Sequence, residues 1–220
     1  LASALLMCTT IVPVMADTGS IADCDDYESL LNSISASDNV SIKLTGDIDL
    51  GDTVDIAAGK EVTIDLNGHT IFLDANDDST GRYAFDNSGS LTLIDNTEEH
   101  KGTVSSRGIY NRNSFTAENV NLSASGSTGG AALWIYDNST TNVKNCNVVT
   151  ENGASGIRSD VGSTEKTIIN IEGTTITSAV HGVIASGSAT KITISNSTVE
   201  AGGIALAANN GGVLETNNAE

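Results

Sequence analysis

The side chains of this sequence that are best suited to bind a ligand recur at a fixed spacing. Tyr110, Trp134 and Arg158 lie 24 residues apart. Aromatic rings can stack on sugar faces, while guanidinium and carboxylate groups hydrogen-bond sugar hydroxyls. Side by side, they would form either a glycan-binding surface or a structural ladder in which Arg158 stacks on Trp134. Two residues after each stands a further polar or aromatic candidate: Arg112, Tyr136 and Asp160.

A short acidic segment is a second candidate site. Asp74, Asn76 and Asp78 have the alternate spacing with which a calcium-binding loop begins, and their oxygen atoms suit Ca²⁺. The rest of that pattern departs from a calcium loop, because the glycine comes late, at Gly81, and Phe85 stands in place of the final glutamate. We therefore expect a solvated turn here, with Ca²⁺ as the alternative, and no other cofactor.

The composition restricts the partners. The net charge of −18 at pH 7 repels nucleic acid and anionic membranes. It also disfavours polyanionic substrates unless Ca²⁺ bridges the two molecules. Hydrophobic residues make up 39% of the 220 residues, which is enough for a folded core. The 22 glycines and the single proline, with few strong helix formers, favour strands and turns.

The first residues have the features of an export signal. Residues 1–16 are mostly apolar or small and end at Ala16, a small residue of the kind that signal peptidase favours. The apolar run is too short to span a membrane, and we expect no membrane span in the mature chain. We predict a signal peptide that lacks its own beginning, and hence a secreted or cell-surface protein.

A repeat of 21–28 residues becomes visible when the turns of the sequence are aligned. Each repeat has alternating apolar residues, then an Asn or Gly that tolerates left-handed dihedrals, then an apolar residue a few positions later. Asn67-Gly68 alone would predict a hairpin turn, but a hairpin does not explain the repeat. The turn positions are Gly46, Gly68, Asn96, Asn119, Asn145, Gly173 and Asn196.

A second apolar column supports the same period and contains Phe85, Ile109, Leu133, Ile157, Val183 and Ile204. Three strand columns at one period predict a solenoid, in which each strand pairs in parallel with its counterpart one coil away. We therefore predict an all-β fold, a single-stranded parallel β-helix of about seven coils over residues 40–220. The residues that follow the second column then share an outward face: Asp86, Tyr110, Trp134, Arg158, Ile184 and Ala205.

The N-terminal segment, residues 17–39, is expected to close one end of the solenoid. Asp25 or Asp26 can cap a short amphipathic helix with apolar residues at helical spacing: Tyr27, Leu30, Leu31 and Ile34. Cys146 lies about four coils from the first turn, roughly 19 Å away, too far for a disulfide with Cys24. We predict that Cys146 points into the core. The final residues look like the opening of another coil, so we expect the chain to continue.

The segment NVSIKLTGDIDLGDTVDIAAGKEVTIDLNGHTI, followed by coils with Gly-Ile or Gly-Val starts and Asn corners, resembles the right-handed parallel β-helix repeat proteins. The resemblance is to the pectate-lyase-like superfamily, in particular its secreted or surface-attached bacterial members, and covers about residues 25–220. It implies the right hand of the coil. The superfamily includes polysaccharide lyases, polygalacturonase-like hydrolases and non-catalytic adhesin domains. The hydrolase motif Gly-His-Gly has only a partial counterpart, at His181-Gly182.

These observations predict a non-catalytic, adhesin-like or glycan-binding domain that is monomeric and takes a glycan or a cell-surface ligand. The alternative is a polysaccharide lyase or glycoside hydrolase with active coils partly outside this sequence. The predicted ligand-binding residues are Tyr110, Arg112, Trp134, Tyr136, Arg158 and Asp160.

Overall fold

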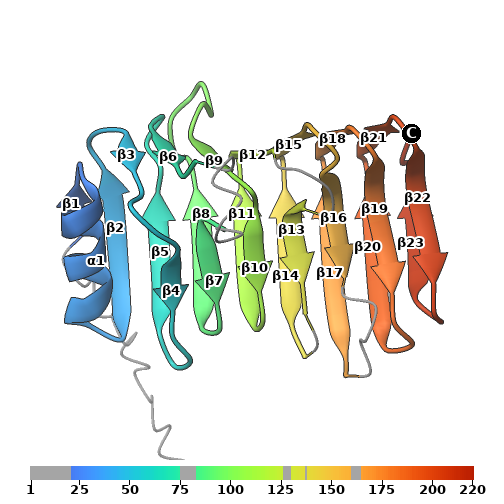
Figure 1. Cartoon of the computed structure of the whole chain (residues 1–220), viewed down its shortest axis with the longest axis horizontal. Coiled ribbons are helices and arrows are strands. Elements are labelled where there is room, and N and C mark those ends of the chain that lie inside the picture. Colours follow the sequence, from blue (N-terminus) through green and yellow to red (C-terminus); the bar gives the residue numbers. More distant parts are fainter. Residues whose placement is uncertain (1–20, 75–82, 126–129, 137, 160–164) are drawn as a thin grey trace, which may run out of the picture.

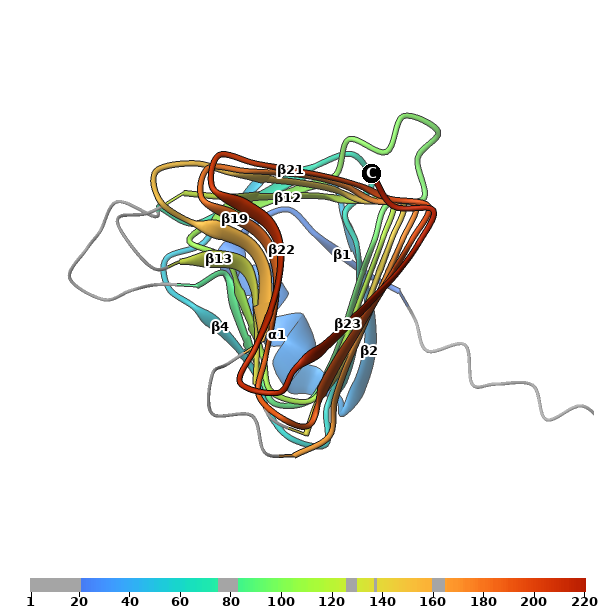
Figure 2. The same ribbon diagram turned by 90° about the vertical axis from the view of Figure 1, so that its right-hand side faces the viewer.

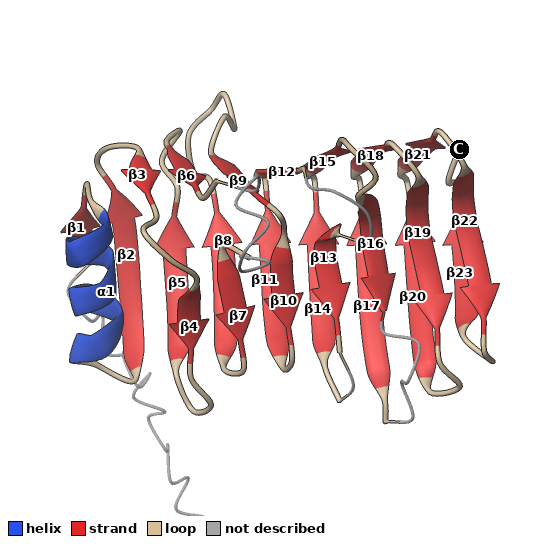
Figure 3. Ribbon diagram, viewed as in Figure 1, coloured by secondary structure: helices blue, strands red, loops and turns tan. Residues whose placement is uncertain are grey.

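The computed structural model describes residues 21–74, 83–125, 130–136, 138–159 and 165–220. The chain winds through three parallel sheets as a β-solenoid of about seven turns, with one short helix at its N-terminal end (Figure 1). Figure 3 shows how far strands dominate the described residues. The predicted solenoid is confirmed.

Each turn contributes one strand to each sheet. The first sheet has nine strands, in spatial order β1 (Ala22–Cys24), β2 (Asn39–Leu44), β5 (Glu61–Asp65), β8 (Ser90–Ile94), β11 (Ser114–Glu118), β14 (Thr140–Lys144), β17 (Thr167–Glu172), β20 (Thr190–Ser195) and β23 (Val213–Asn217). The second contains β3 (Ile48–Asp49), β6 (Thr70–Phe72), β9 (Thr103–Ser106), β12 (Asn121–Ala124), β15 (Asn147–Thr150), β18 (Thr175–Ser178) and β21 (Thr198–Ala201). The third contains β4 (Val54–Ile56), β7 (Phe85–Asn87), β10 (Ile109–Asn111), β13 (Ala131–Ile135), β16 (Ser155–Ser159), β19 (His181–Ser186) and β22 (Ile204–Asn209).

The hand of the coil can be followed from the C-terminal end. In Figure 2 the chain passes from β21 at the top to β22 on the left and then to β23 on the right. It turns counterclockwise while it advances toward the viewer, which makes the solenoid right-handed.

The register of the second sheet is the one that the aligned turns predict. Its inward apolar residues pair in sequence from coil to coil: Ile48, Ile71, Val104, Leu122, Val148, Ile176 and Val199. All of them are buried. The prediction holds even where the chain inserts extra residues between the turn and the strand, before Val104.

In the third sheet the predicted column is correct up to Val183 and wrong in the last turn. Leu206, not Ile204, pairs with Val183, and Ile204 pairs with His181 and is 52% exposed. Residues two apart on a strand share a face, so alternation alone cannot distinguish them. The outward column therefore ends at Ala207 instead of Ala205.

The predicted left-handed residue is confirmed at five of the seven turn positions, at Gly68 with φ of 80° and at four later corners that share one form. Asn119, Asn145, Gly173 and Asn196 have φ of 59°, 51°, 58° and 49°. Gly173 leaves no room for a side chain, because a Cβ there would lie 2.5 Å from Asn145 Oδ1. Each of these corners has two residues, and the second of them is buried, which places Cys146 inside the core as predicted.

The earlier corners differ from the later ones. At Asn67-Gly68 both residues have positive φ and the His69 N–H donates to the Leu66 carbonyl at 2.8 Å, the geometry of a hairpin turn. The turn nevertheless joins β5 to β6 in different sheets. Gly46 and Asn96 do not adopt positive φ, so the predicted left-handed corner is wrong there.

The corner at Asn96 is opened by an inserted loop that projects from the solenoid before β9 (Figure 1). Asp95 is fully buried at its base and accepts hydrogen bonds from the Gly102 N–H at 2.6 Å and from the Thr97 N–H and hydroxyl at 2.9 and 2.7 Å. His100, with φ of 48°, supplies the left-handed residue in this loop.

A polar ladder runs through the core between the first and third sheets. Asn87 Nδ2 donates to Asn111 Oδ1 at 2.8 Å, and Asn111 Nδ2 donates to Thr141 Oγ1 at 2.9 Å. All three residues are fully buried. Because buried amides need partners, this ladder fixes the coils in register.

The N-terminal end is closed by α1 (Tyr27–Ala36), as predicted. Asp26 caps it by accepting the Ser29 N–H at 2.7 Å, and Leu30 and Ile34 are buried. The strand β1 before the helix was not predicted. Cys24, at its end, and Cys146 are free thiols and buried. The predicted signal peptide lies outside the described residues, and no described helix is long and apolar enough to cross a membrane.

Candidate functional site

The third sheet brings most of the predicted binding residues together on its outward face. Strand pairing places Asp86, Tyr110, Trp134 and Arg158 in direct register along four consecutive coils. With their neighbours they collect three of the four tyrosines, the only tryptophan and three of the four arginines of the sequence. We call this the Tyr–Trp–Arg surface; it consists of Tyr83, Asp86, Arg107, Tyr110, Arg112, Trp134, Tyr136 and Arg158.

Its aromatic rings form one continuous cluster. Tyr83 stacks on Tyr110 with 3.6 Å between ring centroids, and Tyr110 meets Trp134 edge-on at 5.7 Å. Trp134 and Tyr136 are nearly parallel, with 15° between the ring planes and 6.4 Å between centroids. Tyr83 was not predicted as a member. Tyr83 lies two residues before the inward Phe85, and Arg107 lies two residues before the inward Ile109. This equal spacing in the sequence could have identified both residues as members of the surface.

Guanidinium groups cover several of these rings. The Arg158 guanidinium lies 4.3 Å from the centre of the Trp134 ring, as the ladder interpretation predicts, and that of Arg112 lies 4.3 Å from Tyr136. Arg107 stands at 5.8 Å over Tyr83. One face of Trp134 and one of Tyr136 are therefore occupied, which reduces the ring area on which a sugar could stack.

The charges on the surface are arranged unequally. Arg112 donates to both carboxylate oxygens of Asp86, at 2.7 and 3.2 Å, and this pairing raises its pKa. Burial and a hydrogen bond with Tyr83 raise the pKa of Tyr110 to about 12, so this phenol stays protonated at neutral pH. Tyr110 is thus unsuited to act as a base.

Three buried nitrogen atoms on this surface lack hydrogen-bond partners. They are Arg107 Nε, Trp134 Nε1 and Arg158 Nε, and within the described ranges no other buried side-chain nitrogen or oxygen is left unpaired. An unpaired buried donor costs about 1–3 kcal/mol, so their concentration in one place is unusual.

Other predicted site residues are less defined. Asp160, Asn76 and Asp78 lie outside the described residues, and Asp74 is exposed just after β6. The described part of the chain contains no cluster of His, Cys, Asp and Glu that could hold a metal ion. Calcium binding at Asp74, Asn76 and Asp78 stays a prediction.

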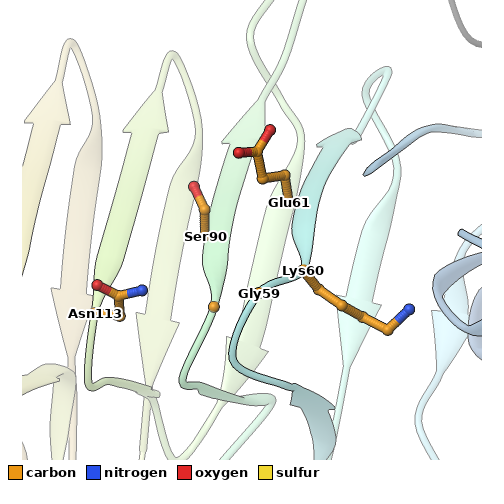
Figure 4. Close-up of a pocket in the computed structure, with 6 residues that line it drawn as sticks. Gly59, Lys60, Glu61, Ser90 and Asn113 are labelled. Carbon is orange, nitrogen blue, oxygen red and sulfur yellow. The ribbon is translucent and has the colours of Figure 1, made fainter. Parts of the chain in front are cut away.

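A small depression of about 120 Å³ lies elsewhere, where loops enter the first sheet (Figure 4). Lys60 extends away from Ser90 and Asn113 in this view and donates to the Ser37 carbonyl at 2.9 Å. Glu61 accepts a hydrogen bond from Asn39 at 3.3 Å. The two ionisable side chains of the depression thus have partners in the neighbouring coil.

Comparisons of the chain with protein-family models, curated proteins and solved structures gave no match. The structure therefore defines a fold class: the protein is a parallel β-solenoid repeat protein, and one of its sheets carries an aromatic and cationic outer face.

Proposed function

We propose that this protein is a non-catalytic, secreted or cell-surface β-helix of the pectate-lyase-like superfamily that binds glycans through the Tyr–Trp–Arg surface. The observation that carries the proposal is the concentration of tyrosine, tryptophan and arginine on one sheet. Only 4% of the residues are aromatic and the net charge is −18, so a random distribution would not gather them there. Tyr, Trp and Arg are the residue types that dominate binding surfaces.

The chemistry of the surface supports binding over catalysis. Glycan cleavage by acid–base chemistry needs a group that exchanges a proton near neutral pH. Tyr110 keeps its proton, because its pKa is about 12. Asp86, whose side chain is the carboxylate group of the Tyr–Trp–Arg surface, accepts two hydrogen bonds from Arg112. The rigid coils present hydrogen-bond donors and ring edges without large rearrangement.

A glycan array probed with the labelled protein tests the proposal. Trp134→Ala should lose the array signal, because it removes the indole ring that meets both Tyr110 and Tyr136. Phe72→Ala is the matched control, since Phe72 is a 43% exposed aromatic residue on the second sheet. Circular dichroism establishes that both variants keep the fold.

Two results would contradict the proposal. The first is a wild-type protein that binds no glycan, and the second is a folded Trp134→Ala variant that binds as well as wild type. Release of sugars from a polysaccharide panel by the wild-type protein would instead support the lyase or hydrolase alternative.

A further inference from the structure

The basic residues of this acidic chain differ in whether a carboxylate neutralises them. Five of them have a carboxylate oxygen within 4.0 Å: Lys60, Lys101, Arg112, Lys144 and Lys191. Four others have no such partner among the described residues: Lys43, Arg107, Arg158 and Lys166. The two arginines among them both lie on the Tyr–Trp–Arg surface. The surface therefore carries uncompensated positive charge, although the sequence has 28 acidic residues against 10 basic ones.

Arg158 offers more to a ligand than Arg107. Its guanidinium packs at 4.3 Å on Trp134. The unpaired donors of this pair, Arg158 Nε and Trp134 Nε1, are themselves buried, so they are not the groups that meet a ligand. The terminal nitrogens of Arg158 are not among the buried atoms and make no hydrogen bond in the described structure, so they are open to a ligand. Arg107 instead stands at 5.8 Å over Tyr83, a ring that is only 5% exposed.

A guanidinium offers only donors, and an oxyanion is the ligand acceptor that matches its charge and fork geometry. Stacking contributes less here, because one face of the Trp134 ring is already covered. The rest of the molecule sets an upper limit on the charge of the ligand, since a chain of net charge −18 repels an extended polyanion.

We propose that the glycan bound by the Tyr–Trp–Arg surface is largely neutral and carries one isolated anionic group, a carboxylate or a sulfate ester, which Arg158 binds beside Trp134. This inference rests on the proposed function. It distinguishes the ligand both from a neutral glycan and from a polyuronate chain. Binding of the anionic group requires no metal ion.

The single tryptophan makes the experiment direct, because ligand binding beside Trp134 changes the only indole fluorescence of the protein. The probes are a neutral trisaccharide, the same trisaccharide with a terminal uronic acid, and the same trisaccharide with one sulfate ester. A polyuronate without Ca²⁺ is the fourth probe. We expect a singly charged probe to bind about tenfold more tightly than the neutral one, the gain from one charge-assisted hydrogen bond.

Variants locate the effect. Arg158→Gln should abolish the preference for the charged probe, while Lys191→Gln, which removes the same charge from the first sheet, should keep it. Arg107→Gln should also keep it. Which of the two charged probes binds more tightly identifies the anionic group as carboxylate or sulfate.

The outcomes separate this inference from the function on which it rests. If neutral and charged probes change the Trp134 fluorescence with equal affinity, and labelled Trp134→Ala loses both glycans on the array, the surface binds glycans and the inference is wrong. The inference is also wrong if Arg158→Gln keeps the preference, if Arg107→Gln alone removes it, or if the polyuronate binds most tightly. If no glycan binds, the proposed function fails as well.

Discussion

Removing the amide of Asn111 should be among the most damaging single changes to the core of this solenoid. Asn111 is fully buried, and its Oδ1 accepts from Asn87 Nδ2 at 2.8 Å and from the Asn113 N–H at 3.2 Å. Its Nδ2 donates to Thr141 Oγ1 at 2.9 Å and, at the longer distance of 3.3 Å, to the carbonyls of Asn113 and Thr140. In Asn111→Ala all five of these bonds are lost at once.

The size of the effect follows from counting the lost bonds. A hydrogen bond in a folded protein contributes about 1 kcal/mol net, and a partner left unpaired in the core costs at least as much. The three shortest bonds alone give a loss of about 3 kcal/mol in the free energy of unfolding. Asn87 Nδ2 keeps its bond to the Ser114 carbonyl at 2.7 Å, which limits the loss at that end.

Urea unfolding followed by Trp134 fluorescence measures the loss in the free energy of unfolding. The fluorescence reports on the coils around Asn111, because Trp134 lies on β13 and Asn111 on the neighbouring strand β10. Asn147→Ala is the control: Asn147 is exposed on β15, and we expect a change within about 0.5 kcal/mol. If Asn111→Ala changes stability no more than Asn147→Ala does, the buried ladder does not stabilise the coils, and the reasoning is refuted.

Three further predictions concern the corners, the inserted loop and the buried thiol. Gly173→Ala should lower the free energy of unfolding by about 1–2 kcal/mol in urea titrations, because φ is 58° and the Cβ would meet Asn145 Oδ1; an unchanged midpoint would contradict this. Burial raises the pKa of Asp95, but hydrogen bonds, that of the Gly102 N–H foremost, outweigh it, and the pKa lies below its usual range. Asp95 therefore stabilises the fold above about pH 4, and this contribution is lost as the pH falls through the folded-state pKa, so Asp95→Asn should weaken the acid-induced fall in melting temperature. Burial raises the pKa of Cys146 to about 11, so a disulfide reagent at pH 8 should label this thiol only after unfolding, and rapid labelling of the native protein would be the contrary result.

The repeat was predictable because its inward positions obey a simple rule. A parallel solenoid stacks equivalent residues, so the apolar residue after each corner had to recur, and Ile71, Val104, Leu122 and Val148 do pair in that order. The rule is insensitive to what lies between columns, which is why the insertion before Val104 did not disturb it. The rule cannot detect a shift of two residues along a strand. For this reason it predicted Ile204 at the inward position that Leu206 occupies.

The buried polar ladder was not predictable from the same rule. Asn87 and Asn111 occupy inward positions, where the pattern of alternation expects apolar residues, and their polarity makes them look like turn residues in a single sequence. Only the structure shows that each amide finds its partner in the next coil. An amide can be buried here because a hydrogen-bond partner recurs in the next coil, one strand spacing away. A core without a repeat would not supply such a partner at every step.

The position of the candidate site was predictable, but its chemistry was only partly so. The 24-residue spacing places Tyr110, Trp134 and Arg158 in one column, and strand pairing does bring them together. The spacing says nothing about side-chain rotamers, and these decide that guanidinium groups cover ring faces. Nor does it show that Asp86 pairs with Arg112 and that Arg158 has no carboxylate partner among the residues that the structure describes. The proposed preference for an anionic ligand depends on that difference between two arginines, which the sequence presents as equivalent.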